Sequence, residues 1–232
     1  MSRILLIHGA WCSGATWGAV TDLLRAQGHD VAAPDMPVMA GDRPAGLGDW
    51  RDAILAALGG GPPALLVGHS LAGMAISAAA EAAPDRIARL AYLCAFLPRD
   101  GDSALDLLRR QPETIRSAVR RGARPGTTEL DLALALPIVA QDAPESAAPA
   151  LGPTLRPQAN PVQTDAVRLH PDRFGRVARA YLLCGRDRTI LPDLQRAMIA
   201  ASPCDPVLAL DTGHFPQLTA PDLLAATLGR LA

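Results

Sequence analysis

A short corner near residue 70 constrains the fold more than any other part of the chain. Residues 64–67 form an apolar run that predicts a buried strand, and the Ala-rich run over 71–83 predicts a helix. Only three residues, 68–70, lie between these runs, so the strand and the helix must meet in a very tight turn. Such a turn holds the Ser70 hydroxyl beyond the carboxyl end of the strand and is typical of a nucleophile elbow.

The residues around Ser70 are small, as a strained corner of this kind requires. Gly68 precedes the serine by two positions and Ala72 follows it by two, where the usual pattern has a second glycine. Because Ala is the smallest possible departure and Gly73 follows at once, we expect the turn to form. A purely structural serine is the alternative interpretation of so short a pattern, and the strand and helix on either side favour the nucleophile.

The rest of the chain alternates between apolar runs of strand type and helix type. Further strands are expected at 4–8, 29–33, 89–96, 180–184 and 207–210, and further helices at 16–27, 47–58, 194–201 and 221–231. This alternation predicts an α/β fold: a mainly parallel six-stranded sheet with helices on both faces. With 232 residues, we expect one domain over 1–232. Residues from about 98 to 176 change character and predict a small inserted cap.

Composition excludes several function classes. The net charge is −1, so no global field would attract nucleic acid, and no apolar run approaches the roughly 20 residues of a membrane span. The first apolar run is too short for a signal peptide, so a cytoplasmic protein is expected. All 22 basic residues are Arg, which excludes a Schiff-base lysine and a Walker A loop. The four cysteines stand singly, so no metal site is indicated.

A serine nucleophile needs a base and an acid, which follow it along the chain in the order acid, then base. His214 comes after the last expected strand, in a turn at the same sheet edge as Ser70, and is our candidate base. Asp187 follows the strand at 180–184 and is our candidate acid, with Asp193 and Asp211 as rivals. The other four histidines are expected to be structural or solvated: His8, His29, His69 and His170.

Acyl transfer also needs backbone donors for the developing oxyanion. Leu71 N–H at the start of the elbow helix is expected to supply one donor. Ala10 N–H in the loop after the first strand is expected to supply the second, and Gly9 beside it allows close backbone approach.

Five stretches give the chain a family resemblance. Residues 7–11, 68–73, 90–98, 184–192 and 213–218 resemble the α/β-hydrolase superfamily, in particular the plant methylesterases of the salicylate-binding type and the hydroxynitrile lyases. The resemblance implies a triad of Ser70, Asp187 and His214, a small and mainly helical cap, and no cofactor. The lyases of this group use a threonine and a lysine where this chain has Gly9 and Phe215, which favours ester hydrolysis.

The leading hypothesis is a serine hydrolase that cleaves a small or medium carboxylic ester. Gly9, Trp11, Leu191 and Phe215 are expected to contact the substrate, together with Leu71. Two alternatives stay open: a carbon–carbon bond lyase or cyclase of natural-product metabolism on the same scaffold, and a non-catalytic sensor of small ligands. The resemblance permits either a monomer or a homodimer.

Six arginines gather in the first half of the expected cap. They could contact an acidic substrate or nucleic acid, but arginines spread over one or two helices more often form a solvated face. We therefore expect a solvated face at Arg109, Arg110, Arg116, Arg120, Arg121 and Arg124.

Overall fold

The computed structural model describes residues 1–144 and 148–232. Its centre is a six-stranded sheet in the order β11-β10-β6-β5-β1-β2, in which every neighbouring pair is parallel. The strands are β1 (Arg3–Ile7), β2 (Asp30–Ala32), β5 (Ala64–His69), β6 (Ile87–Leu93), β10 (Arg179–Cys184) and β11 (Val207–Leu210). The predicted α/β fold is confirmed, and its two central strands, β5 and β6, are those that flank the serine corner in sequence.

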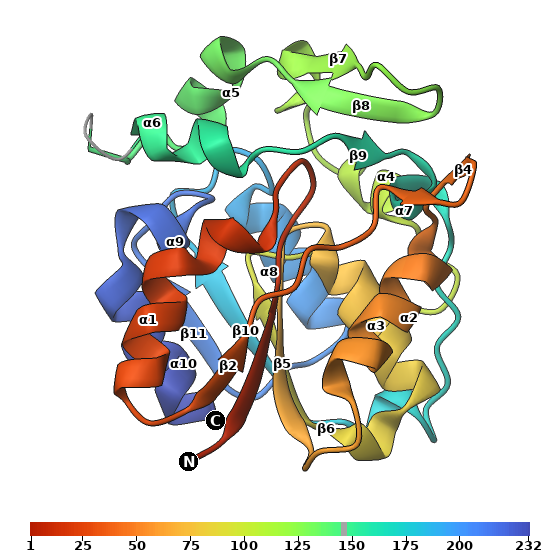
Figure 1. Ribbon diagram of the computed structural model, residues 1–232, viewed down its shortest axis with the longest axis vertical. Coiled ribbons are helices and arrows are strands. Elements are labelled where there is room, and N and C mark those ends of the chain that lie inside the picture. Colours follow the sequence, from red (N-terminus) through yellow and green to blue (C-terminus); the bar gives the residue numbers. More distant parts are fainter. Residues whose placement is uncertain (145–147) are drawn as a thin grey trace.

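Helices cover both faces of the sheet (Figure 1). They are α1 (Gly18–Ala26), α2 (Leu47–Leu58), α3 (Ala72–Ala82), α8 (Pro192–Ala201), α9 (Pro216–Thr219) and α10 (Pro221–Leu231), with 3-10 turns η1 (Gly14–Trp17) and η2 (Pro84–Arg86). Apolar residues of α2, α3 and α8 form one buried cluster, and those of α1 and α10 form a second on the opposite face. Strands buried on both faces explain the continuous apolar runs in the sequence.

Two local features differ from the sequence prediction. The strand expected at 89–96 ends at Leu93, because Cys94 has a φ of 34° and turns the chain out of the sheet. Residues 34–46, where the sequence analysis expects neither a strand nor a helix, contain a small antiparallel hairpin of β3 (Met39–Ala40) and β4 (Arg43–Pro44).

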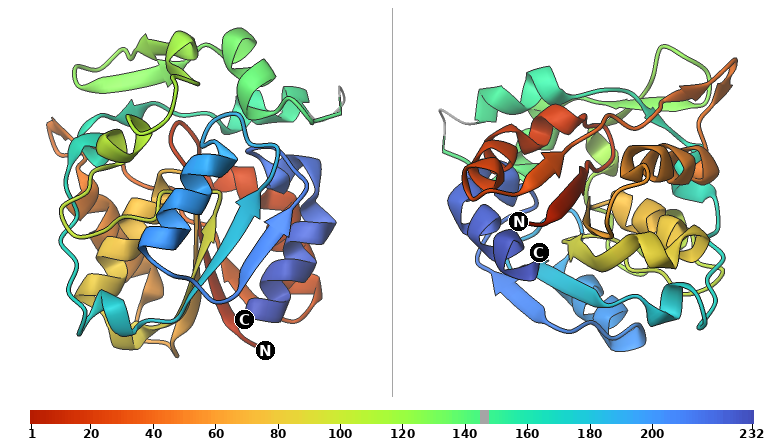
Figure 2. Two further views of the ribbon diagram at one scale, coloured as in Figure 1. Left: turned by 180° about the vertical axis from the view of Figure 1, so that it is seen from behind. Right: turned by 60° about the horizontal axis from the view of Figure 1, so that its bottom comes forward.

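Most of the chain between β6 and β10 lies over the carboxyl ends of the strands, and its last residues return beside α3 to the opposite end of the sheet (Figures 1 and 2). Residues 119–121, 127–130 and 158–159 form an antiparallel sheet in the order β7-β8-β9, which the sequence did not predict, although helical residues outnumber strand residues in this segment. Its elements are α4 (Ala104–Leu108), η3 (Arg116–Ala118), β7 (Val119–Arg121), β8 (Thr127–Leu130), α5 (Leu132–Val139), α6 (Ala148–Leu151), η4 (Gly152–Thr154), β9 (Gln158–Ala159), α7 (Pro161–Thr164) and η5 (Phe174–Arg176). Residues 145–147 of the expected cap lie outside the described residues, and the cap boundaries of about 98 and 176 stay a prediction.

The cap segment packs directly on the loops at the carboxyl edge of the sheet. A third apolar cluster joins cap residues such as Ile115 and Val139 to Cys12 and Phe215 of the sheet loops. Trp11 Nε1 donates to the Thr128 hydroxyl at 3.0 Å. None of the described helices combines the length and the apolar composition that a membrane-spanning helix needs.

Candidate active site

The corner between β5 and α3 has the strained geometry that its sequence predicts. Ser70 has a φ of 55°, which non-glycine residues rarely adopt. Space around the corner is very limited, because a Cβ on Gly68 would lie 2.9 Å from Ile76 Cδ1 and one on Gly73 would lie 1.9 Å from the Phe96 carbonyl oxygen. The small residues are therefore required by packing, and they set Ser70 at the sheet edge.

Ser70, His214 and Asp187 form a continuous hydrogen-bonded row. His214 Nε2 lies 3.0 Å from Ser70 Oγ, and His214 Nδ1 lies 2.7 Å from Asp187 Oδ2. The serine comes from the end of β5, the histidine from the loop after β11, and the aspartate from the loop after β10. Three parallel strands thus deliver the three side chains to one edge of the sheet.

The hydrogen-bond partners of the His214 ring determine which of its two nitrogens carries the proton. A carboxylate only accepts hydrogen bonds, so Nδ1 carries the proton and donates to Asp187. Nε2 is then left to accept from the Ser70 hydroxyl, which is the arrangement that a general base needs. The rival carboxylates lie elsewhere: the side chains of Asp193 and Asp211 are 97% and 89% exposed and pair with arginines.

Four N–H groups surround the Asp187 carboxylate, which is buried. Oδ1 accepts from the backbone of Thr189 at 2.7 Å and of Ile190 at 3.1 Å, and Oδ2 accepts from Gln195 Nε2 at 3.3 Å as well as from the histidine. Sequence analysis missed Gln195. A glutamine one turn into a helix gives no pattern of its own, and its role becomes visible only when α8 is packed against the end of β10.

The two expected oxyanion donors lie beside Ser70. Within the part of the chain that the structure describes, neither Ala10 N–H nor Leu71 N–H has a hydrogen-bond acceptor. A Cβ on Gly9 would lie 2.9 Å from Ser70 Cβ, so the loop after β1 approaches the serine as closely as expected.

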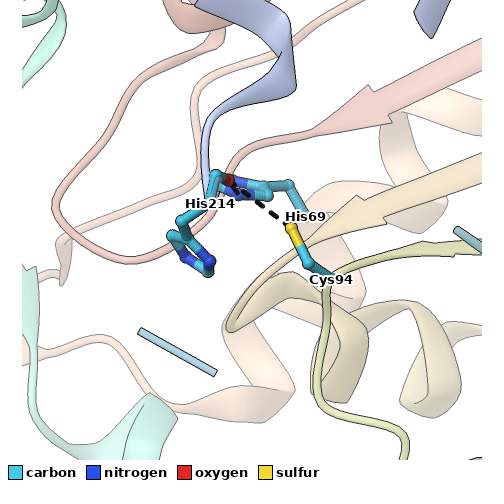
Figure 3. A group of neighbouring side chains, drawn as sticks. All are labelled: His69, Cys94 and His214. Carbon is cyan, nitrogen blue, oxygen red and sulfur yellow. Dashed lines mark hydrogen bonds between the residues drawn. The ribbon is translucent and has the colours of Figure 1, made fainter. Parts of the chain in front are cut away.

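A second buried group, His69, Cys94 and His214, has the residue types of a metal site (Figure 3). Three of its four ring nitrogens already have other partners, and His69 Nδ1 has none among the described residues. Both His214 nitrogens are used by the candidate triad, and His69 Nε2 donates to the His214 carbonyl oxygen at 2.8 Å. The Cys94 thiol also donates to this carbonyl oxygen, at 3.5 Å. This arrangement fits a support for the His214 backbone better than a metal centre.

The other histidines have the structural roles that the sequence predicts for them. Burial, followed by the neighbouring His214, holds the pKa of His69 well below its usual value, and its Nδ1 is buried without a described partner. Burial also lowers the pKa of His8, whose ring contacts Gly9 O and Met36 N–H. His170 lies at the surface beside Glu81.

A cavity of about 610 Å³ is lined by the cap, and Trp11 reaches it from the loop after β1. Trp11 lines it, as expected, together with cap residues such as Leu108, Ile115 and Val119. The other expected contacts lie apart from it: Gly9 is beside Ser70, Leu191 lines a separate cavity of about 330 Å³, and Phe215 is buried against the rings of His69 and His214. Ser70, Asp187 and His214 do not line the large cavity as the described residues form it.

The arginine group of the cap is a solvated face. Most of its members pair with a nearby carboxylate, and Arg116, 80% exposed beside Glu113, is typical. The side chains in this group are exposed or half-buried: Arg109, Arg110, Arg116, Arg120, Arg121 and Arg124.

A model of the alpha/beta hydrolase family matches residues 4–227. The chain belongs to this family. Methylesterase 7 of Arabidopsis thaliana is 28% identical over 98% of this chain and 93% of its own length. Probable esterase PIR7A of Oryza sativa is 30% identical over 97% of this chain and 93% of its own. A solved pyrethroid hydrolase from Sphingobium faniae is 25% identical, with a TM-score of 0.85 over 99% of this chain and 96% of that one.

These relatives bear out two predictions made from the sequence. The predicted resemblance to plant methylesterases is confirmed by the named relatives, and so is the prediction of a carboxylic ester hydrolase. The predictions of a cytoplasmic location, of a monomer or homodimer, and of no nucleic-acid partner stay predictions.

Proposed function

We propose that the protein is a serine esterase in which Ser70 is the nucleophile, His214 the general base and Asp187 the acid that orients it. The observation that carries the proposal is the pair of hydrogen bonds through the His214 ring, 3.0 Å to the serine and 2.7 Å to the aspartate. Distances of this size allow direct proton transfer between neighbouring groups.

In the first half of the reaction, Ser70 Oγ attacks the carbonyl carbon of the ester while His214 Nε2 takes the hydroxyl proton. Negative charge then moves to the carbonyl oxygen, to which we expect the N–H groups of Ala10 and Leu71 to donate; one such donor typically contributes about 10² to 10³ in rate. Asp187 stabilises the imidazolium that forms. When the carbon–oxygen bond to the alcohol breaks, His214 returns the proton to the leaving oxygen, and an acyl-serine remains.

The second half repeats these steps with water. His214 takes a proton from a water molecule, the hydroxide oxygen attacks the acyl carbon, and the bond to Ser70 Oγ breaks as the proton passes back to it. The carboxylic acid leaves and Ser70 is restored. The same two N–H groups serve both halves, because each passes through a tetrahedral oxyanion.

The proposed substrates are small or medium carboxylic esters, including aromatic ones. Methyl esters are the first candidates, because relatives of this chain are named methylesterases and methyl jasmonate esterase.

Two residues favour hydrolysis over the carbon–carbon lyase or cyclase alternative. A lyase of the resembling group would carry a threonine at position 9, but a Cβ there would lie 2.9 Å from Ser70 Cβ and 3.0 Å from His69 Nδ1. It would carry a lysine at position 215, where Phe215 is buried against two imidazole rings.

Turnover of a panel of methyl, alkyl and aryl esters by the wild-type protein and by Ser70→Ala tests the proposal. We expect hydrolysis of at least one class by the wild type and a loss of about 10⁴ to 10⁶ in kcat on substitution. Wild-type turnover by Ser70→Ala would contradict the proposed nucleophile, whereas failure of a fluorophosphonate probe to label Ser70 would revive the sensor alternative.

A further inference from the structure

The cap contacts the loop that carries Asp187 through two side chains, Gln111 and Thr114. The Gln111 amide spans the loop: its Nε2 donates to the Thr189 carbonyl oxygen at 2.7 Å, and its Oε1 accepts from Leu191 N–H at 2.9 Å. The Thr114 hydroxyl donates to the same Thr189 oxygen at 2.9 Å. Two donors from the cap therefore converge on one carbonyl oxygen.

That oxygen belongs to the peptide group between Thr189 and Ile190, whose N–H donates to Asp187 Oδ1 at 3.1 Å. Hydrogen bonds in a chain polarise one another, so a peptide that accepts at its oxygen donates more strongly at its N–H. Asp187 in turn holds His214, and His214 contacts Ser70. A continuous chain of hydrogen bonds thus leads from the cap to the candidate nucleophile.

The middle of this chain is shielded from water. Thr189, Ile190 and Asp187 are 7%, 1% and 2% exposed, so solvent does not compete for these groups, and polar interactions are stronger in such surroundings. Gln111 lines both the cavity of about 610 Å³ and the smaller one of about 330 Å³. One side chain therefore lines both cavities and also contacts the loop of the candidate acid.

We propose that Gln111 and Thr114 are positioning residues that hold and polarise the Thr189–Ile190 peptide and thereby stabilise the Asp187 carboxylate. The inference rests on the proposed esterase function, since it concerns the acid of that triad. Without these donors the Ile190 N–H donates less strongly, and more negative charge stays on the carboxylate that faces the histidine. The imidazolium of His214 is then stabilised further, so a higher pH is needed to free the base.

The groups around the Asp187–His214 pair are His69, Cys94, Cys184 and Tyr181, with Arg186 at the surface beside Asp142. Burial lowers the pKa of His69 and raises the pKa of Cys94 and of Tyr181. These three are uncharged near neutral pH. A shift in the acidic side of the pH profile of activity is therefore assigned to the Asp187–His214 pair itself.

The test measures kcat/KM against pH for Thr114→Val and Gln111→Met, on an ester that the wild type hydrolyses. We expect the midpoint of the acid limb to rise by about 0.3 pH units in each variant, a fraction of the effect of one whole hydrogen bond. Thr114→Ser keeps the hydroxyl and should restore the wild-type midpoint. If the two side chains had a merely structural role, the substitutions would lower the melting temperature and leave the midpoint of the acid limb unchanged.

Gln141→Ala is the matched control. Gln141 Nε2 also reaches from the cap to this loop, donating to the Arg186 carbonyl oxygen at 2.7 Å. The N–H of that peptide belongs to Asp187 and points at the Cys184 carbonyl oxygen at 3.3 Å, not at the carboxylate. This variant therefore removes a hydrogen bond between the cap and the loop but none from the chain of hydrogen bonds that leads to Ser70. The acid limb of its pH profile of kcat/KM should match that of the wild type.

A second readout does not depend on turnover: the NMR resonance of the His214 Nδ1 proton in the resting protein. It should move in Thr114→Val and Gln111→Met, return in Thr114→Ser and stay in place in Gln141→Ala. If neither the midpoint nor the resonance moves in the first two variants, the inference is wrong. Absence of ester hydrolysis by the wild type would instead contradict the proposed function. The resonance would still test whether Gln111 and Thr114 act on the Asp187–His214 pair.

Discussion

Asp187→Asn changes the hydrogen bonding of the candidate triad and hardly changes its shape. Four N–H groups point at two carboxylate oxygens: those of Thr189 and Ile190 at Oδ1, at 2.7 and 3.1 Å, and those of His214 and Gln195 at Oδ2, at 2.7 and 3.3 Å. An amide offers only one oxygen. The two backbone groups cannot turn away, so the oxygen must face them and the NH₂ must face the histidine.

The histidine then has a donor opposite Nδ1 and must place its own proton on Nε2, facing Ser70. In that tautomer it cannot accept the hydroxyl proton, and substitutions of this kind lower kcat by about 10⁴. This corresponds to about 5 kcal/mol of transition-state stabilisation. Gln195 Nε2 also loses Asp187 Oδ2 as an acceptor, but it keeps the carbonyl oxygens of Ile190 at 2.7 Å and Cys184 at 3.3 Å, so the folded state should lose little stability.

The assay is kcat on the best wild-type ester, together with urea unfolding to show that the variant is folded. Asp193→Asn and Asp211→Asn are the controls, because these side chains are 97% and 89% exposed and lie outside the hydrogen-bonded row. Both controls should retain wild-type kcat. A folded Asp187→Asn protein with kcat within about tenfold of the wild type would refute the reasoning, since the predicted tautomer loss is about 10⁴.

Three further predictions concern the corner and its surroundings. Gly73→Ala places a Cβ 1.9 Å from the Phe96 oxygen, so urea unfolding should show a loss of about 1–3 kcal/mol; an unchanged midpoint would contradict the packing argument. Gly9→Ala presses on Ser70 Cβ at 2.9 Å and should lower kcat by about 10²-fold, the scale of a 1 Å misplacement, in a variant that still folds. The pKa of His8 and of His69 is lowered in the folded state, so as the pH falls the unfolded chain binds protons before the folded protein does. The stabilisation is therefore fully present above about pH 6.5. Below that pH, the free energy of unfolding decreases by up to about 1.4 kcal/mol per pH unit for each histidine. Urea midpoints from pH 5 to 8 check this, and His69→Gln should reduce the slope.

The sheet and the candidate triad were predictable because their signals are local. Each of the three side chains follows an apolar strand within a few residues, and parallel strands bring their carboxyl ends to one edge. The spacing of small residues around Ser70 likewise reports the crowding that a Cβ would meet at Gly68 and Gly73.

The supporting residues were not predictable, because their partners are backbone atoms far away in the chain. Gln111 contacts residues about 80 positions later, and nothing near it in sequence marks that contact. The cap sheet escaped prediction for the same reason: β8 pairs with β9 across about 30 residues, and each strand is too short to show a period. The cavity walls depend on how the cap folds, which explains why Leu191 and Phe215 lie outside the large cavity.

Covalent labelling by a fluorophosphonate, followed by mass spectrometry of the intact protein and of its peptides, tests the central claim most directly. The account predicts a single adduct on Ser70, no adduct in Ser70→Ala, and much slower labelling in His214→Gln, because an unassisted serine hydroxyl is a weak nucleophile. Equal labelling of the wild type and Ser70→Ala, or no labelling of Ser70 in the folded protein, would contradict it.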